Sequence, residues 1–220
     1  MTLIVFDVDG TLVDSQHMIV AAQAEAFAAV GLPAPSRARS LSVVGLSLPQ
    51  AFTVLVGTDG PVEALSEAYK QSFGRLRAMA EIREALFPGA ADLLARLNRE
   101  AAVQLGIATG KSRRGVDHLV AVHGWEGWFS TVQTADDAPS KPHPAMLHQA
   151  MAEAGAEPSR TVMIGDTSYD MAMARAAGVT ALGVSWGYHL PEALHEAGAD
   201  AVVDSFAALD DALRRHIAAG

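Results

Sequence analysis

The stretch "LIVFDVDGTLVDS" (residues 3–15) decides the fold, because it joins an apolar run directly to a pair of carboxylates. The run 3–6 is typical of a strand that is covered on both faces of a parallel sheet. Asp7 and Asp9 follow two residues apart, so side-chain alternation along an extended chain places them on the same side. An ordinary Asp-Gly turn would account for Asp9 and Gly10 alone. It would not account for Asp7 or for the apolar run that leads into it.

Further apolar runs along the chain predict more buried strands, and helical patterns that end at glycines separate them. One such pattern, 112–124, begins at Ser112 and ends at Gly124. Strands that alternate with helices predict an α/β fold with a doubly wound parallel sheet. The predicted strands after the first are 102–109, 161–166, 179–185 and 200–205.

Residues 15–85 break this alternation. They contain helical patterns and no clear strand, and the α/β pattern returns at "LFPGA". The sequence therefore predicts two domains, a core made of 1–14 and 86–220 and a helical insert made of 15–85.

Composition narrows the classes of function. Half of the 220 residues are hydrophobic, which allows a sizeable core. The net charge of −9 with only 16 Lys and Arg disfavours nucleic acid and anionic membranes as partners. The chain has no cysteine, no basic leader segment and no apolar run near the roughly 20 residues of a membrane span. We expect a cytoplasmic protein, and both a monomer and a homodimer remain open.

Polar residues gather where the predicted strands end, which is where open α/β sheets bind ligands. Asp7 and Asp9 end one strand, Thr109 ends another and Asp166 ends a third. Carboxylates this close, with Asp170 joining them, would repel one another and raise a pKa. A divalent cation removes this repulsion. Oxygen ligands without His or Cys favour Mg²⁺.

The same residues suit phosphoryl transfer. One carboxylate of the pair can attack phosphorus, and the other can move protons. The phosphoryl oxygens need donors, which Thr109, the Gly110 backbone N–H and a lysine can supply. Lys141 lies between prolines in "PSKPHP", in a loop before a predicted helix.

The segments "DVDGT", "IATGKS", "SKPHP" and "GDTSYD" resemble the four ordered motifs of the haloacid dehalogenase superfamily. The segments "DGTLVDS", "FPGA" and "GVSWGY" resemble phosphoglycolate-phosphatase-like members most closely, and the insert resembles the small α-helical cap of the superfamily. The resemblance implies that Asp7 is the nucleophile and Asp9 the general acid and base. It implies Mg²⁺ bound by Asp7, the Asp9 carbonyl and Asp166. The other implied roles are phosphate binding by Thr109 and Lys141, and orientation of the metal or the lysine by Asp170.

The predicted function is Mg²⁺-dependent hydrolysis of a small phosphorylated metabolite, phosphoglycolate or a similar ester, through an aspartyl-phosphate. A phosphosugar mutase of the same family remains open, and a haloacid dehalogenase or a non-catalytic binding module is less well supported. Substrate specificity is expected in the insert. Its predicted specificity loop contains Gly45, Leu46 and Ser47.

Four basic residues are expected to have ordinary surface positions. Lys111 is predicted to be a surface residue where a helix begins. Arg37, Arg39 and Lys70 could bind a substrate carboxylate, but each is better explained as part of a solvated helix face.

Overall fold

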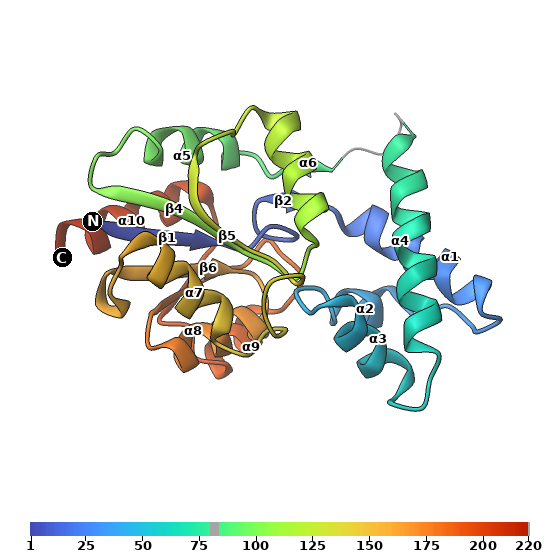
Figure 1. Cartoon of the computed structure of the whole chain (residues 1–220). Coiled ribbons are helices and arrows are strands. Elements are labelled where there is room, and N and C mark those ends of the chain that lie inside the picture. Colours follow the sequence, from blue (N-terminus) through green and yellow to red (C-terminus); the bar gives the residue numbers. More distant parts are fainter. Residues whose placement is uncertain (80–83, 220) are drawn as a thin grey trace.

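The computed structural model describes residues 1–79 and 84–219, and its centre is a parallel sheet (Figure 1). The six strands of this sheet lie in the order β5-β4-β1-β6-β7-β8, and every neighbouring pair is parallel. The predicted fold class, a doubly wound parallel sheet, is therefore confirmed. The strands are β1 (Thr2–Phe6), β4 (Val103–Ala108), β5 (Phe129–Gln133), β6 (Thr161–Gly165), β7 (Thr180–Val184) and β8 (Ala201–Val203).

Helices cover the two faces of this sheet. Alternate residues of β1 point to opposite faces, so Ile4 and Phe6 pack in one apolar cluster while Leu3 and Val5 pack in another. Figure 1 shows α5 and α10 on one side of the sheet and α7, α8 and α9 on the other. The bounds are α5 (Ala90–Leu97), α6 (Arg113–His123), α7 (Ala145–Ala154), α8 (Ser168–Ala177), α9 (Pro191–Glu196) and α10 (Phe206–Ala219).

The insert lies beyond the end toward which β1 runs, so that its helices face the carboxyl edge of the sheet (Figure 1). Within the described residues of 15–85, Ala85 alone is in a strand, and that strand, β3, pairs with β2 outside the main sheet. The division into a core and a separate insert domain remains an interpretation of this arrangement. The elements are β2 (Val13–Asp14), α1 (Gln16–Ala29), α2 (Arg37–Leu41), α3 (Leu48–Val56), α4 (Val62–Ala78) and β3 (Ala85–Leu86).

No helix among residues 1–79 and 84–219 is both long and apolar enough to cross a membrane.

Candidate active site

The site begins where three neighbouring strands end. Asp7 follows β1 and donates its backbone N–H to the Ile164 carbonyl of β6 at 2.9 Å. Asp166 follows β6, and Thr109 follows β4 on the other side of β1. Because parallel strands end at the same edge, the predicted residues are brought together by the order of the strands.

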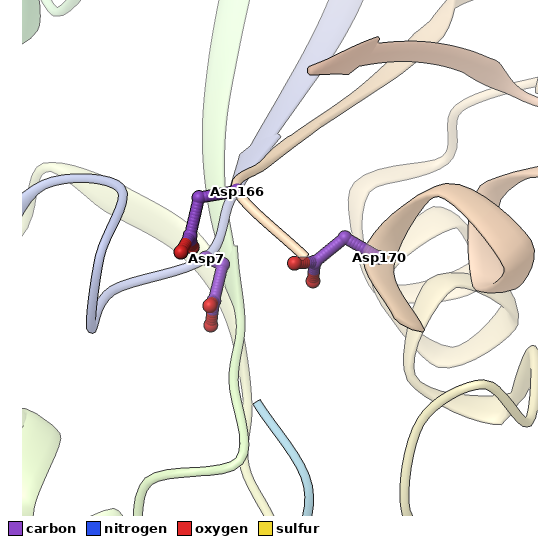
Figure 2. Close-up of side chains that lie close together, drawn as sticks. All are labelled: Asp7, Asp166 and Asp170. Atoms are coloured by element: carbon purple, nitrogen blue, oxygen red, sulfur yellow. The ribbon is translucent and has the colours of Figure 1, made fainter. Parts of the chain in front are cut away.

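Three carboxylates converge at this edge (Figure 2). Asp7, Asp166 and Asp170 each have one oxygen within 4.8 Å of the others, and all three residues are at most 1% exposed. Asp170 comes from the first turn of α8, not from a strand end. The structure thus places Asp170 beside Asp7 and Asp166, in the group of carboxylates that the sequence predicts around a cation.

Two hydrogen-bond donors and two glycines lie close to the Asp166 side chain. Thr11 Oγ1 donates to one oxygen at 2.9 Å, and the Tyr188 N–H donates to the other at 2.8 Å. A Cβ atom on Gly10 would lie 2.2 Å from Asp166 Oδ2, and one on Gly187 would lie 2.1 Å from the Asp166 Cβ. Glycine at both positions therefore permits the close approach that holds this carboxylate in place.

Asp170 has both oxygens engaged by donors. Lys141 Nζ lies 2.6 Å from Oδ1, while the N–H and hydroxyl of Thr167 donate to Oδ2 at 3.1 and 2.7 Å. The bond from the Thr167 N–H is one half of the capping box of α8, and the Asp170 N–H, which donates to Thr167 Oγ1 at 3.4 Å, makes the other half. This geometry fits a residue that orients Lys141 better than a direct metal ligand.

Lys141 is a fully buried cation between two carboxylates. Its Nζ lies 2.9 Å from Asp7 Oδ1 and 2.6 Å from Asp170 Oδ1, and its side chain is 0% exposed. Burial lowers the pKa of Lys141, but Asp170 and Asp7 outweigh that effect and the pKa is raised. The lysine therefore stays protonated and carries a fixed positive charge into the site.

Asp7 has the fewest hydrogen bonds of the three carboxylates. Neither oxygen accepts a well-formed hydrogen bond from any described residue, although Lys141 lies at ion-pair distance. Burial, opposed by Lys141 and reinforced by Asp170, raises the pKa of Asp7 to about 6. Burial together with the Asp7 and Asp170 charges also raises the pKa of Asp166. A buried carboxylate whose one close partner among the described residues is the Lys141 cation, and which lies beside a second buried carboxylate, fits a divalent cation, which would lower both pKa values.

The Asp9 side chain lies outside this group. Its Oδ1 accepts from Ser15 Oγ at 2.6 Å, and Lys111 Nζ lies 2.9 Å from Oδ1 and 3.1 Å from Oδ2. Asp9 is only two residues from Asp7 in the sequence, but the two carboxylates have different partners. Ser15 and Lys111 contact Asp9, whereas Lys141 contacts Asp7.

The expected surface position of Lys111 is wrong. Its side chain is 7% exposed, and its Nζ also lies 2.8 Å from Glu84 Oε1. Burial lowers the pKa of Lys111, but Asp9 and Glu84 outweigh that effect and the pKa is raised. One signal in the sequence was available: Lys111 lies only two residues after Thr109, in the loop before α6 begins at Arg113.

A cavity of about 640 Å³ lies between the core and the insert, and Asp7, Asp9, Thr109 and Gly110 line it. The predicted specificity loop lines it as well. A Cβ atom on Gly110 would lie 2.5 Å from the Gly45 carbonyl oxygen, so loop and core touch at this glycine. The loop residues along the cavity include Gly45, Leu46 and Ser47.

The three basic residues of the insert that were considered for a substrate carboxylate separate into two groups. Lys70 lines the cavity, whereas Arg37 contacts Gln16 and Arg39 donates to the Val54 carbonyl at 3.1 Å. Lys70 is thus the one of the three that the structure places where it can meet a ligand.

Known proteins are similar to this chain in sequence and in fold. A family model described as haloacid dehalogenase-like hydrolase matches residues 4–184. A probable phosphatase, IndB, from Dickeya dadantii is 34% identical over 93% of this chain and 90% of its own length. A phosphoglycolate phosphatase from Salmonella choleraesuis is 31% identical over 92% of this chain and 88% of its own length.

Solved structures agree with these relatives. A hydrolase from Pseudomonas syringae superposes with a TM-score of 0.85 at 30% identity, covering 98% of this chain and 99% of that one. CbbY from Rhodobacter sphaeroides, solved in complex with phosphate, has a TM-score of 0.78 at 30% identity and covers 95% and 96%. With its matching motifs, fold and arrangement of strand-end aspartates, the chain belongs to the haloacid dehalogenase-like hydrolase family.

Proposed function

We propose that this hydrolase cleaves small phosphomonoesters with the help of Mg²⁺, through a phosphoryl group carried on Asp7. One observation carries the proposal. The Asp7 carboxylate is buried, has Lys141 Nζ 2.9 Å from one oxygen but no well-formed hydrogen bond from a described residue, and lines the cavity close to Asp166. A buried carboxylate that faces a cavity, next to the fixed positive charge of Lys141, is suited to attack an anionic phosphorus centre.

Two half-reactions follow from the arrangement of the residues. In the first, an oxygen of Asp7 bonds to phosphorus, the bond from phosphorus to the ester oxygen breaks, and Asp9 gives its proton to the departing alcohol. In the second, water bonds to phosphorus, Asp9 takes a proton from that water, and the bond to Asp7 breaks to release inorganic phosphate. Asp9 ends the cycle protonated, as it began.

The charge of the phosphoryl group needs compensation. Asp7, Asp166 and the Asp9 carbonyl would hold Mg²⁺, which when bound neutralises part of the charge that the carboxylate and the phosphoryl group bring together. Lys141 supplies a second positive charge, 2.9 Å from Asp7 Oδ1. Thr109 and the Gly110 N–H would donate to the phosphoryl oxygens from the end of β4.

The cavity favours a small ester. At about 640 Å³ it has the size of a metabolite pocket, and the insert covers it. Several relatives are named phosphoglycolate phosphatase, and Lys70 on the cavity wall is a cation that a carboxylate could reach. Phosphoglycolate or a similar anionic phosphate ester is the substrate class that we favour.

The test is a screen of the purified protein against metabolite phosphates, with phosphoglycolate first. Phosphate release should require Mg²⁺, stop with EDTA and return when Mg²⁺ is added in excess. Calcium should restore little, because its larger and looser shell would misplace the nucleophile and the phosphate. Full activity in EDTA would contradict the metal assignment, and transfer of phosphate within a sugar phosphate would instead identify a mutase.

A further inference from the structure

A chain of four buried or half-buried charges runs from the insert to Asp9. Arg77 Nε lies 2.8 Å from Glu84 Oε2, Glu84 Oε1 lies 2.8 Å from Lys111 Nζ, and Lys111 Nζ lies 2.9 Å from Asp9 Oδ1. The exposed fractions of these side chains are 20%, 4%, 7% and 13%, from Arg77 to Asp9. None of the three contacts is a surface ion pair of the kind that contributes little.

The members of this charge chain come from different parts of the molecule. Arg77 belongs to the last turn of α4 in the insert, and Glu84 lies just before β3, where the polypeptide returns to the core. Lys111 and Asp9 lie at the carboxyl edge of the sheet. The charge chain therefore crosses from the insert to the core beside the segment that joins them.

Phe73 of α4 fixes both cations of the charge chain. Its ring centroid lies 4.9 Å from Arg77 Cζ and 5.1 Å from Lys111 Nζ, which is within the range of cation–π attraction. Phe73 also lines the cavity. The position of Lys111 thus depends on a ring of the insert as well as on Glu84.

The alternative is a purely structural network, because buried ion pairs occur without any role in catalysis. The charge chain ends at Asp9, the residue proposed to move the proton, and this argues against a purely structural network. Lys111 contacts both oxygens of Asp9, and the other described side chain that bonds this carboxylate is Ser15. The cation that ends the charge chain therefore determines where the Asp9 carboxylate points.

We propose that Lys111 and Glu84 are positioning residues that aim the Asp9 carboxylate at the leaving-group oxygen, and that they do so only when the insert is seated on the core. This inference rests on the proposed function, in which Asp9 moves the proton. Neither residue needs to touch the phosphoryl group. Misplacing a catalytic group by about 1 Å can cost on the order of 100-fold in rate.

The test compares two substrates of similar shape whose leaving groups differ in basicity. 4-Nitrophenyl phosphate loses a stable phenolate, whereas phenyl phosphate loses a basic one and depends more on Asp9. Lys111→Met and Glu84→Gln should lower kcat for phenyl phosphate about 10- to 100-fold. The first turnover of 4-nitrophenyl phosphate should fall less than about threefold. Lys111→Arg, which keeps the charge, should restore much of the difference.

Two comparisons separate this role from a structural one. In an Asp9→Asn background, Lys111→Met should cause no further loss, because the group that it positions is already gone. Glu25→Gln breaks a Glu–Arg pair on the exposed surface of the insert and should leave the ratio of the two substrates unchanged. Equal losses on both substrates, or losses that multiply with Asp9→Asn, would overturn the inference.

The failure of the proposed function would look different. It would appear as an Asp9→Asn protein with the same leaving-group dependence as the wild type, or as an active Asp7→Asn protein. If Lys111→Met does not fold, Glu84→Gln and Lys111→Arg decide the question by the same ratio of substrates.

Discussion

At the scale of single residues, the site depends on unequal treatment of two aspartates that are two positions apart. Asp7 is buried beside Lys141 and lacks a well-formed hydrogen bond among the described residues, while Asp9 is held by Ser15 and Lys111. The Asp7 carboxylate faces the cavity, where it can form a bond, whereas Ser15 and Lys111 fix the orientation of the Asp9 carboxylate, which is the group proposed to move protons.

This difference predicts distinct defects for the two asparagine variants. Asp7→Asn should abolish turnover of every ester, because an amide is a far poorer nucleophile and metal ligand. Asp9→Asn should still release about one nitrophenol per site from 4-nitrophenyl phosphate and then turn over on the order of 10²–10⁴-fold more slowly. Rapid quench measures the burst, and mass spectrometry should find the phosphate on Asp7. Slow release without a burst would favour direct attack by water.

The carboxylates also predict how Mg²⁺ affects stability at different pH values. Burial raises the pKa of Asp7 from 3.8 to about 6, and the pKa of Asp166 is raised as well. An acid whose pKa is higher in the folded state destabilises the fold once it ionises. The penalty is absent below its ordinary pKa and complete above the raised one. The increase in Tm on adding Mg²⁺ should therefore be small near pH 4 and grow as the pH rises through about 6.

Thermal melts in EDTA and in Mg²⁺ measure this increase. Asp7→Asn serves as the control, because it removes one of the two titrating groups and should flatten the rise. An increase in Tm that is independent of pH would show that Mg²⁺ does not act on these carboxylates.

The sequence predicted the strand-end residues because strand order alone brings them together. Asp7, Thr109 and Asp166 needed only three buried strands and the rule that parallel strands end at one edge. Lys111 could not be predicted in this way. Its burial depends on Glu84 and on the ring of Phe73, both of which approach from the insert.

At the scale of elements, local capping signals were informative where nothing competed with them. Ser112 accepts from the Gly115 N–H at the start of α6, and Gly124 ends that helix in a left-handed conformation, as the pattern predicts. Ser47 is a different case. Gln50 follows it at the three-residue spacing of a capping box, but the Ser47 side chain makes no cap bond and its N–H donates to Ser140 Oγ at 2.9 Å. A contact with the core replaces the local one there.

One strand of the main sheet, β5, could not be predicted from its local sequence. β5 has the sequence "FSTVQ", lies at the edge of the sheet and is only partly buried. An edge strand needs no continuous apolar run, because one of its sides has no neighbouring strand to match. Its short mixed pattern therefore gives a weak signal, although it pairs with β4 next to Thr109.

The contact between the specificity loop and the core predicts the effect of a single methyl group. A Cβ on Gly110 would lie 2.5 Å from the Gly45 carbonyl oxygen and 2.6 Å from that of Leu46, and backbone atoms yield poorly. Gly110→Ala should destabilise the fold by about 1–3 kcal/mol and lower kcat/KM on the order of 100-fold by displacing the loop.

Gly74→Ala is the matched control for this prediction. It adds the same methyl group inside α4, where no atom other than the backbone of that helix lies within 4 Å, and should stabilise the protein by up to about 1 kcal/mol. Denaturant melts and steady-state kinetics compare the two variants. A Gly110→Ala protein with wild-type stability and kinetics would show that the loop does not rest on Gly110.

At the scale of the whole molecule, the insert touches the core around the cavity through few polar contacts. Tyr169 of α8 donates its hydroxyl to the Ser42 carbonyl at 3.0 Å, and the Ser47 N–H donates to Ser140 Oγ. The charge chain adds a further contact, in which Glu84 Oε1 of the insert lies 2.8 Å from Lys111 Nζ of the core. Because a substrate must enter a cavity that the insert covers, we expect these contacts to break and re-form during turnover.

The final prediction concerns the Tyr169 contact as a measure of that closure. Tyr169→Phe removes a hydrogen bond with a net value of about 1 kcal/mol, which shifts an open–closed equilibrium about fivefold toward the open form. Hydrogen exchange of α3 in Mg²⁺ and orthovanadate should then be several-fold faster than in the wild type, and KM should rise while the first turnover at saturation is nearly unchanged. Ser66→Ala removes a hydroxyl–carbonyl bond that lies wholly inside α4 and should leave exchange in α3 unchanged. Equal exchange in the wild type with and without vanadate would mean that the insert stays seated on the core, and substrate would then have to enter by another route.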